Sequence, residues 1–402
     1  MNGKGLLSVD EALDVLLAGA QPVAEIEEVP TLEATGRVLA RAQASTMDVP
    51  PMDNSAMDGY ALRLADVRAP DARLRVAQRI AAGAVGKPLE PGTAARIFTG
   101  APIPPGADAI VMQEFCAADG DHVVVKKVPQ PGEWIRHRGS DIRKGAAILG
   151  AGIRLRPQDT GLAASVGIKS LPVYRRVRLA LFFTGDELVM PGDPLPAGRI
   201  YNSNRFTLNG LAGTFDCEVR DFGIVPDSLA ATREVLRRAA AAADIIVTSG
   251  GVSVGDEDHV KPAVEAEGSL LMWKIAMKPG RPLAFGKVGK ASFIGLPGNP
   301  VSSFVTFLVF VRPFLLKTQG IAQVAPRAIE ARADFEWPKP DPRREFLRVK
   351  WNARGGLDLY PTQDSAVLTS TAWADGLVDN PPNHPIANGD RVRFLPFSEL
   401  YG

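Results

Sequence analysis

Short apolar runs alternate with helical patterns through the second half of this chain, and no other feature constrains the fold more. The apolar runs are residues 177–183, 244–247 and 291–294, and the helical patterns are residues 202–213, 227–243 and the segment after Pro300. Parallel strands need long crossover connections, usually helices, and these helices cover both faces of the sheet. Residues 174–325 are therefore predicted to form a three-layer αβα domain around a mostly parallel sheet.

The flanking regions differ, because short β-type runs alternate there with proline and glycine turns. The expected domains are a β-rich insert at residues 46–139, a C-terminal β domain at residues 326–402, and a discontinuous N-terminal or linking domain at residues 1–45 and 140–173. Ser8 and Glu11 predict a capping box at the start of the first helix. Asp227 is expected to cap the helix that follows it. The fold class is thus α/β plus β in a multi-domain chain.

Charge and cysteine content exclude several classes of function. Lys and Arg number 46 against 45 Asp and Glu, so no overall field favours nucleic acid or an acidic membrane. Two cysteines and four scattered histidines argue against a disulfide scaffold or a His-rich metal site and favour a reducing cytoplasm. The most apolar window, residues 304–311, is expected to end at Arg312-Pro313, short of the roughly 20 residues that cross a bilayer. A small anion held by local cations remains possible.

Three loops follow the predicted strands of the αβα domain. They are Thr184-Gly-Asp-Glu187, Thr248-Ser-Gly-Gly-Val-Ser-Val-Gly-Asp-Glu-Asp258 and Gly295-Leu-Pro-Gly-Asn-Pro-Val-Ser302. The second can wrap backbone N–H groups around a phosphate, and its carboxylates imply a divalent cation, most simply Mg²⁺. In the third, Asn299 is a natural N-cap and Pro300 suits the first helical position, so a helix N-terminus faces the same edge.

Each loop alone has a simpler interpretation as a tight turn between a strand and a helix. A glycine-rich loop by itself binds phosphate in roughly one case in four. Three such loops at one edge of a sheet favour a nucleotide site, because ligands bind beyond the carboxyl ends of the strands.

A cationic segment, residues 273–282, lies between the second and third loops. As one strand it would place Lys274 and Lys278 on the same face, with Arg281 on the following turn. Two interpretations stay open: an edge strand whose charges discourage aggregation, or a rigid pocket for a small oxyanion.

Two polar loops lie in the predicted insert. Asp53-Asn-Ser-Ala-Met-Asp58 and the turn that begins at Thr99 each suit either a structured active-site loop or a series of Asx turns. The residues alone do not decide between these two.

Five motifs then occur together and in order. They are Asp53-Asn-Ser-Ala-Met-Asp-Gly-Tyr60, Thr99-Gly-Ala-Pro-Ile-Pro104, Thr184-Gly-Asp-Glu187, Thr248-Ser-Gly-Gly-Val-Ser-Val-Gly-Asp256 and Gly295-Leu-Pro-Gly-Asn-Pro-Val301. Across nearly the whole chain they resemble the molybdopterin molybdenumtransferase (MoeA-like) family, to which the gephyrin E domain is related. The resemblance implies that molybdate is inserted into adenylylated molybdopterin with release of AMP, and that Mg²⁺ is required. It also implies an elongated homodimer, with the active cleft between the α/β domain of one subunit and the insert of the other.

The resemblance also assigns roles to individual residues. The catalytic residues it implies are Asp58, Thr99, Glu187 and Asp258, of which Glu187 and Asp258 would hold the metal. The residues implied to bind the nucleotide and pterin are Asp227, Gly250, Gly251, Ser253, Pro297, Pro300 and Ser302. The residues implied to bind molybdate are Lys278, Arg281 and Pro282, with Arg348 and Ser365 from the C-terminal domain. Asp141 matches an acidic residue between domains.

Two departures from the family pattern concern the oxyanion. Asp364 stands before Ser365 where relatives often have glycine, and a carboxylate there would repel molybdate. Arg281 replaces a lysine of many relatives, which keeps the charge but offers a planar fork instead of a point donor.

Two other functions are compatible with parts of the sequence. The α/β domain alone would suit a molybdopterin adenylyltransferase, but the insert and the C-terminal domain have no role in one. A non-catalytic, gephyrin-like scaffold is the second alternative. Small-molecule substrates are expected, with a molybdopterin adenylyltransferase and molybdoenzyme chaperones as possible protein partners, and with neither nucleic acid nor a membrane.

Overall fold

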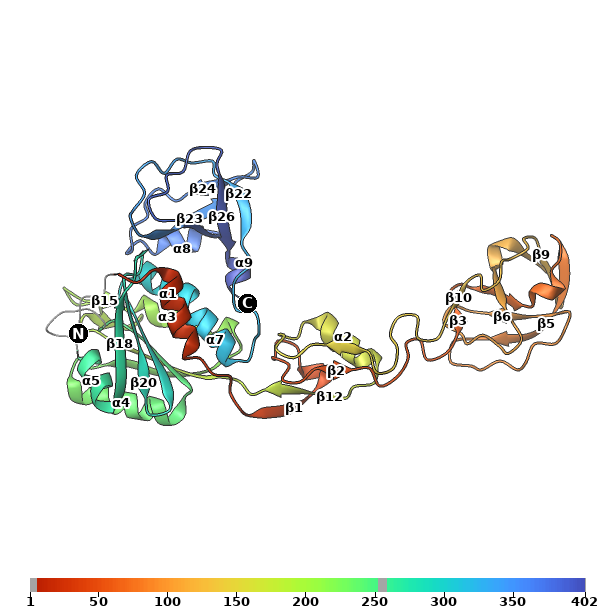
Figure 1. The fold of residues 1–402 in the computed structure, drawn as a ribbon, viewed down its shortest axis with the longest axis horizontal. Helices are drawn as coiled ribbons and strands as arrows, with labels where there is room; N and C mark the ends of the chain where they lie inside the picture. The colour runs from red at the N-terminus through yellow and green to blue at the C-terminus, as the bar shows by residue number, and fades with distance from the viewer. Residues whose placement is uncertain (1–5, 252–258, 402) are drawn as a thin grey trace.

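The computed structural model describes residues 6–251 and 259–401 of the chain. Figure 1 shows an elongated molecule: the α/β unit and the C-terminal sheet lie at one end, the insert lies at the other, and a slender unit links them. The predicted fold class is confirmed, since a three-layer αβα unit, a β-rich insert and a C-terminal β unit are all present.

The α/β unit is built on a six-stranded sheet. Its strands, in spatial order, are β16 (Glu218–Val225), β13 (Arg178–Thr184), β17 (Ile245–Ser249), β21 (Ala291–Leu296), β20 (Pro282–Val288) and β18 (Gly268–Lys274). The first four strands pair in parallel, as predicted for β13, β17 and β21, whereas β16 was not predicted as a strand. The last two pair antiparallel and were not predicted as strands of this sheet. The carboxyl ends of β13, β17 and β21 therefore lie side by side at one edge.

Helices cover both faces of this sheet. One face carries α4 (Leu229–Ala242) and α5 (Val260–Glu267), and the other carries α1 (Val9–Ala18), α3 (Ser203–Thr214), α6 (Pro300–Thr306) and α7 (Arg312–Thr318). The strands serve both cores by alternation: Leu181 and Phe183 pack on one side of β13, and Phe182 packs on the other. The middle positions of the central strands are apolar for this reason, as the hydrophobic runs had indicated, whereas Thr184, Thr248 and Ser249 place buried polar side chains at the carboxyl ends of β13 and β17.

Helix starts agree with the sequence in one case and differ in another. Ser8 and Glu11 form the predicted capping box at the start of α1. At α4 the cap is Ser228, whose hydroxyl accepts from the Ala231 amide, and not the predicted Asp227. Asp227 consequently stands one residue before the cap, among the residues that line the cavity described below.

The apolar helix does not end at Arg312-Pro313. It continues from Pro300 to Thr318 through a π-helical turn, Phe307–Val311, so that Pro313 falls near the start of α7, where its missing N–H costs little. This helix is long and apolar enough to span a bilayer, but 89% of its most apolar 18-residue window is buried inside the protein. The Arg312 guanidinium donates to three main-chain carbonyls, and burial lowers its pKa to about 10.

The linking unit and the insert are small β structures. The linking unit contains β1 (Ile26–Pro30) paired with β12 (Ser170–Tyr174), β2 (Gln43–Ala44) paired with β11 (Ala147–Leu149), and α2 (Pro157–Ser165). The insert has a six-stranded sheet in the order β7 (Ala109–Met112), β4 (Gly59–Leu62), β6 (Thr93–Ile97), β5 (Ala72–Ile80), β9 (His122–Val125) and β8 (Cys116–Asp119), with β3 (Asn54–Ser55) and β10 (Ile135–Arg136) pairing beside it. The domain boundaries drawn from the sequence stay predictions.

The C-terminal unit takes one strand from the α/β region. Its sheet has the spatial order β19 (Met277–Lys278), β23 (Arg344–Trp351), β25 (Gly376–Asn380), β26 (Arg391–Pro396) and β22 (Ile329–Arg332), with β24 (Leu357–Leu359) paired beside β23. The helices of this unit are α8 (Thr369–Trp373) and α9 (Phe397–Leu400). In the α/β unit, a separate pair is formed by β14 (Leu188–Val189) and β15 (Ile200–Tyr201). The prediction of one strand over residues 273–282 is therefore wrong. Lys274 ends β18 in one sheet and Lys278 ends β19 in another, so the two lysines do not share a strand face.

Asp244 ties the exit of the linking unit to the α/β sheet. Its carboxylate accepts two bonds from the Arg175 guanidinium, at 2.7 and 2.8 Å, and one from the Arg178 amide of β13 at 2.8 Å. Burial raises the pKa of Asp244, but these hydrogen bonds together lower it by more than burial raises it. The pKa of Asp244 therefore lies below its usual range.

We predict that Asp244→Asn lowers the free energy of unfolding by about 2 kcal/mol at pH 7, because it weakens charge-assisted bonds to a half-buried carboxylate. A depressed folded pKa contributes stability above the unfolded value of about 4 and loses it as the pH falls through the folded value. The gap between the wild type and the variant should therefore shrink from pH 7 to pH 3. Urea titration with hydrogen exchange of the β13 and β17 amides measures it. Glu234→Gln, which changes an exposed carboxylate of α4, is the control, and a gap independent of pH would contradict the assignment.

Candidate active site

One large cavity opens where the carboxyl ends of β13, β17 and β21 meet the C-terminal unit. Its volume is about 1070 Å³. The residues singled out in the sequence that line it are Glu187, Asp227, Gly250, Gly251, Lys278, Arg281, Pro282, Pro297, Pro300, Ser302 and Ser365. The three loops of the α/β unit and the cationic segment therefore share a single cavity. Ser253 and Asp258, which were also singled out, lie outside the described residues.

The glycine loop packs tightly on the end of β13. Gly250 has φ +94° and Gly251 has φ +65°, and both values favour glycine. A Cβ on Gly250 would lie 2.6 Å from the Thr184 carbonyl oxygen, and one on Gly251 would lie 2.5 Å from a Val260 methyl group. Two adjacent positions without side chains leave main-chain groups as the surface that this loop presents to the cavity.

A polar network joins the second and third loops. The Asn204 amide donates to Ser249 Oγ at 2.8 Å and to the Gly298 carbonyl at 2.7 Å. Ser249 Oγ in turn donates to the Pro297 carbonyl at 2.9 Å. Asn204 and Ser249 both line the cavity, but the sequence offered no signal that Asn204, within a predicted helix, would reach a loop 94 residues away.

Two buried polar atoms of cavity-lining residues lack a partner in the described part of the chain. They are Thr184 Oγ1 and Asn202 Nδ2. A buried donor or acceptor without a partner costs about 1–3 kcal/mol, so such groups are normally satisfied by water or by a ligand. Their position at the carboxyl end of β13 and just before α3 places two polar groups in this part of the cavity that water or a polar ligand can satisfy.

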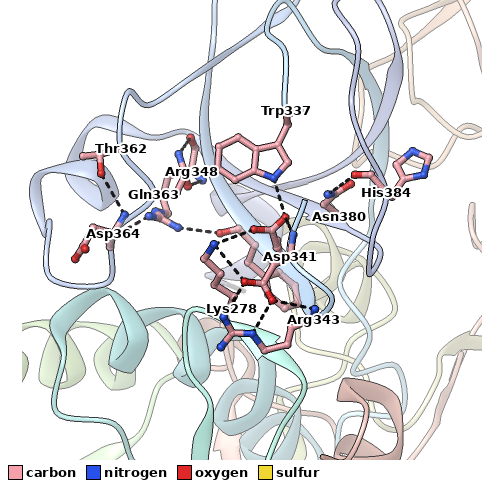
Figure 2. A network of polar contacts seen from close by, with 12 residues as sticks. Lys278, Trp337, Asp341, Arg343, Arg348, Thr362, Gln363, Asp364, Asn380 and His384 are labelled. Atoms are coloured by element: carbon pink, nitrogen blue, oxygen red, sulfur yellow. Dashed lines mark hydrogen bonds and ion pairs between the residues drawn. The ribbon is translucent and has the colours of Figure 1, made fainter. Parts of the chain in front are cut away.

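The opposite end of the cavity is cationic, and its charges are held by an acidic pair behind them. Lys278 Nζ lies 3.4 Å from an Asp341 oxygen and 3.3 Å from a Glu345 oxygen. Figure 2 shows that the side chains of Lys278 and Arg343 both reach the Asp341 carboxylate. Glu345, 1% exposed, also accepts from Trp337 Nε1 at 2.7 Å. The Arg343 guanidinium holds the pKa of Asp341 far below its usual range.

The segment from 363 to 368 closes the cavity from the C-terminal unit. The Asn299 amide donates to Ser365 Oγ at 2.9 Å, and the Val301 amide donates to the Ser365 carbonyl at 3.0 Å. Asn299 thus occupies the N-cap position of α6 as predicted, but its side chain makes no capping bond. Asp364 also lines the cavity, with its carboxylate accepting from the Ala366 amide at 2.8 Å.

Arg348 supports this segment from behind. Its side chain is buried and is not among the residues that line the cavity. The guanidinium donates to the Phe346 and Asp364 carbonyls at 3.1 and 3.2 Å, and burial lowers its pKa to about 10. Contact between Arg348 and molybdate stays a prediction, whereas its contacts in this structure position the loop that carries Ser365.

Comparison with known proteins agrees with this arrangement. Residues 7–167 match the family description "MoeA N-terminal region (domain I and II)", residues 180–317 match "Probable molybdopterin binding domain", and residues 330–397 match "MoeA C-terminal region (domain IV)". The molybdopterin molybdenumtransferase of Haemophilus influenzae is 38% identical over 99% of this chain and 100% of that protein. The chain belongs to the MoeA family.

Other members of the MoeA family extend the likeness. The molybdopterin molybdenumtransferase of Nostoc sp. is 41% identical over 74% of this chain and 71% of that protein. The crystal structure of the molybdopterin biosynthesis moeA protein from Pyrococcus horikoshii superposes with a TM-score of 0.85, at 30% identity, over 98% of this chain and 100% of that one. The four-unit architecture is therefore a MoeA-family architecture.

Two of the predicted catalytic residues lie in the insert. Thr99 donates to Asp58 Oδ1 from both its amide and its hydroxyl, each at 2.8 Å, and these two bonds lower the pKa of Asp58. The structure thus brings Asp58 and Thr99 together, as the two insert motifs had suggested. It does not bring them to the cavity of the same chain, since the insert is at the far end of the molecule (Figure 1).

The glycine loop gives a test of the geometry of the cavity. The control is Gly289, which lies outside the glycine loop, between β20 and β21. It has φ +57°, and the nearest atom to an added Cβ is 3.8 Å away. We expect Gly289→Ala to lower the free energy of unfolding by about 1 kcal/mol through backbone strain alone. Gly251→Ala adds contacts below 3 Å at a similar φ, so we expect a loss of about 2–3 kcal/mol. Thermal unfolding of both variants measures the difference. Equal losses would show that the loop is not packed as described.

Proposed function

We propose that this chain inserts molybdate into adenylylated molybdopterin and releases AMP. Membership of the MoeA family makes it an enzyme of molybdenum cofactor biosynthesis. The observation that carries the specific reaction is the single cavity, with a main-chain glycine loop at one end and Lys278 and Arg281 at the other. These two ends suit the two anionic substrates of the reaction.

The residues of the chain act mainly by holding two anions that repel each other. Molybdate carries two negative charges, which Lys278 and Arg281 offset at short range in a partly enclosed space. The glycine loop and the Asn204–Ser249 network form a rigid main-chain surface for the phosphates of the adenylylated pterin. Two free anions meet rarely because they repel each other. Binding both in one cavity holds them close together, and this proximity can supply much of the rate enhancement of the reaction.

The donor atoms on the glycine-loop side are compatible with Mg²⁺. Glu187 and Asp227 both line the cavity, and their carboxylates are the hard oxygen ligands that Mg²⁺ prefers. The described residues contain no cluster of three or more His, Cys, Asp or Glu side chains that would hold a metal by themselves. Mg²⁺ commonly binds through one or two carboxylates together with substrate phosphates, so two lining carboxylates provide ligands of the right kind. We assign Glu187 as a ligand, with Asp258 as the second predicted one; Mg²⁺ would neutralise phosphoryl oxygens there.

The insert supplies its catalytic residues to a second subunit. Asp58 and Thr99 form an ordered pair, but they lie far from the cavity of their own chain. A homodimer in which each insert faces the partner's cavity gives the pair a role and uses the elongated shape.

The cytoplasm is the proposed compartment, in keeping with two unpaired cysteines, Cys116 and Cys217.

The direct test is AMP release from adenylylated molybdopterin by the purified chain. We expect release to require both molybdate and Mg²⁺, as measured by chromatography of the nucleotide. ATP consumption without molybdate would instead indicate the adenylyltransferase, and failure to bind molybdopterin would indicate a scaffold. Asp258→Ala, with Mg²⁺ present, tests the metal assignment, because wild-type rates would remove it.

Complementation between two inactive variants tests the shared site. Asp58→Asn and Lys278→Gln should each abolish AMP release, whereas their co-expression should restore about a quarter of the wild-type activity, because half of the randomly formed dimers contain one intact site of two. Lys278→Gln with Arg281→Gln is the matched control: both changes lie in one cavity, so mixed dimers have no intact site. Recovery in the control pair alone, or in neither pair, would refute the shared site.

A further inference from the structure

Arg96 is a half-buried cation in the insert, on β6, just before the motif that begins at Thr99. Its Nη1 donates to the Gly59 carbonyl at 2.8 Å, and its Nη2 donates to Gln113 Oε1 at 2.6 Å. Both acceptors belong to residues next to Asp58 or bonded to it. An arginine that is held by a main-chain carbonyl and an amide oxygen joins segments of backbone, and here those segments carry the Asp58–Thr99 pair.

The hydrogen bonds of Arg96 fix the main chain around Asp58. The Asp58 carbonyl accepts from the Gln113 amide at 3.1 Å, and the next carbonyl, that of Gly59, accepts from Arg96. A Cβ on Gly59 would lie 2.0 Å from the Val111 carbonyl oxygen, so β4 and β7 are in close contact at this point. Bonds from a charged donor are stronger than those between neutral groups. Any shift of the Asp58 main chain would therefore break contacts to Arg96 or to Gln113.

A second contact of Arg96 fixes the start of the turn that carries Thr99. The guanidinium carbon of Arg96 lies 4.6 Å from the centre of the Phe98 ring, within the range in which a cation is attracted to an aromatic face. Phe98 directly precedes Thr99, and its amide donates to the Ile80 carbonyl at 3.3 Å. The turn thus leaves the sheet from a residue whose ring and main chain are both held.

The Asp58 carboxylate is oriented by the pair of segments that Arg96 joins. Both Thr99 donors bind Asp58 Oδ1, whereas Asp58 Oδ2 accepts no hydrogen bond from another residue within 6–251 and 259–401. One oxygen is therefore used inside the insert, and the other is left for a substrate group. The two Thr99 bonds lower the pKa of Asp58 most, and the charge of Arg96 adds a smaller lowering, so the carboxylate stays ionised.

We propose that Arg96 is a positioning residue, which ties the strand of Asp58 to the turn of Thr99 and so presents Asp58 Oδ2 to the cavity of the second subunit. The inference rests on the proposed function, in which each insert serves the cavity of its partner. A reacting group displaced by about 1 Å can lose about 10²-fold in rate, so a residue behind the pair can control turnover. A planar guanidinium reaches two acceptors while it lies on a ring, whereas a lysine supplies one point donor.

The kinetic test is molybdate-dependent AMP release by the full-length protein. We expect Arg96→Met to lower kcat about 30-fold and Arg96→Lys to lower it about fivefold, because lysine keeps the charge and loses one of the two bonds. The KM for each substrate should change less than about twofold, because Arg96 touches neither. A rise in KM with kcat unchanged would overturn the proposal.

Arg79→Met is the matched control for these kinetics. Arg79 lies opposite Arg96 on β5, and its guanidinium carbon is 4.8 Å from the centre of the same Phe98 ring. Its side chain makes no hydrogen bond with another residue in the described part of the chain. We expect its kcat to stay within about twofold of the wild type, since it removes a cation from the ring but no bond to the Asp58 segment. Equal losses in the Arg79 and Arg96 variants would contradict the positioning role.

A double-mutant cycle shows whether Arg96 acts through the pair. Thr99→Val removes the hydroxyl bond to Asp58 Oδ1 and keeps the shape of the side chain. In the Thr99→Val background, Arg96→Met should lower kcat by only about fivefold, because part of what Arg96 holds in place is already lost. Losses that multiply in full would overturn the proposal. Arg96→Lys serves in the same cycle if the Met variant does not fold.

Hydrogen exchange tests the geometry without the reaction. The Thr99 amide donates to Asp58 Oδ1, so its protection reports on the pair directly. Arg96→Met should speed the exchange of this amide about tenfold, and Arg79→Met should leave it unchanged, as measured by mass spectrometry of overlapping peptides that isolate Thr99. Equal protection in the wild type and the Arg96 variants would overturn the inference. Absence of molybdate-dependent AMP release by the wild type would overturn the proposed function instead, and the exchange result would still decide whether Arg96 holds the pair.

Discussion

Main-chain pairing between β19 and β23 joins the two walls of the candidate active site. Met277 and Lys278 leave the α/β region and pair in parallel with Arg344 and Glu345, so the C-terminal sheet is completed by a strand from another unit. This pairing places Lys278 next to Asp341 and Glu345 and brings the 363–368 segment over the α/β loops. Without it, Lys278 would not be paired beside Glu345, although the bonds from Asn299 and Val301 to Ser365 and the shared apolar core would still hold the C-terminal unit against the α/β unit.

Much of the α/β unit could be predicted because its signals are local. A strand buried on both faces is apolar along most of its length, and residues 179–183 of β13, 245–247 of β17 and 293–296 of β21 show this. The glycine loop was equally visible, since φ values near +94° and +65° restrict those positions to glycine. The antiparallel strands β18 and β20 were missed because Lys274, Pro279 and Pro282 obscure where one strand ends and the next begins.

The missed site residues are those whose role depends on contacts far along the chain. Arg343 and Asp341 form an ordinary turn by sequence, and only β19 brings them to Lys278. Arg348 shows the opposite case. This cation, which the family resemblance implied as a ligand, is buried and bonded to carbonyls because β23 is covered on both faces along residues 345–349. Sequence spacing reports which face of a strand a residue occupies only once the strand's neighbours are known.

The separation of charge within one cavity allows a chain of net charge +1 to offer separate places for the two anions of the proposed reaction. Glu187 and Asp227 lie on the side of the glycine loop, whereas Lys278, Arg281 and Arg343 lie on the side of the C-terminal sheet. Under the proposed function, a metal-bound phosphate would fit the acidic side, and a bare oxyanion would be attracted to the cations on the other side. Since these opposing charges nearly cancel at a distance, the cavity attracts small ions that enter it but offers no extended field to a polyanion.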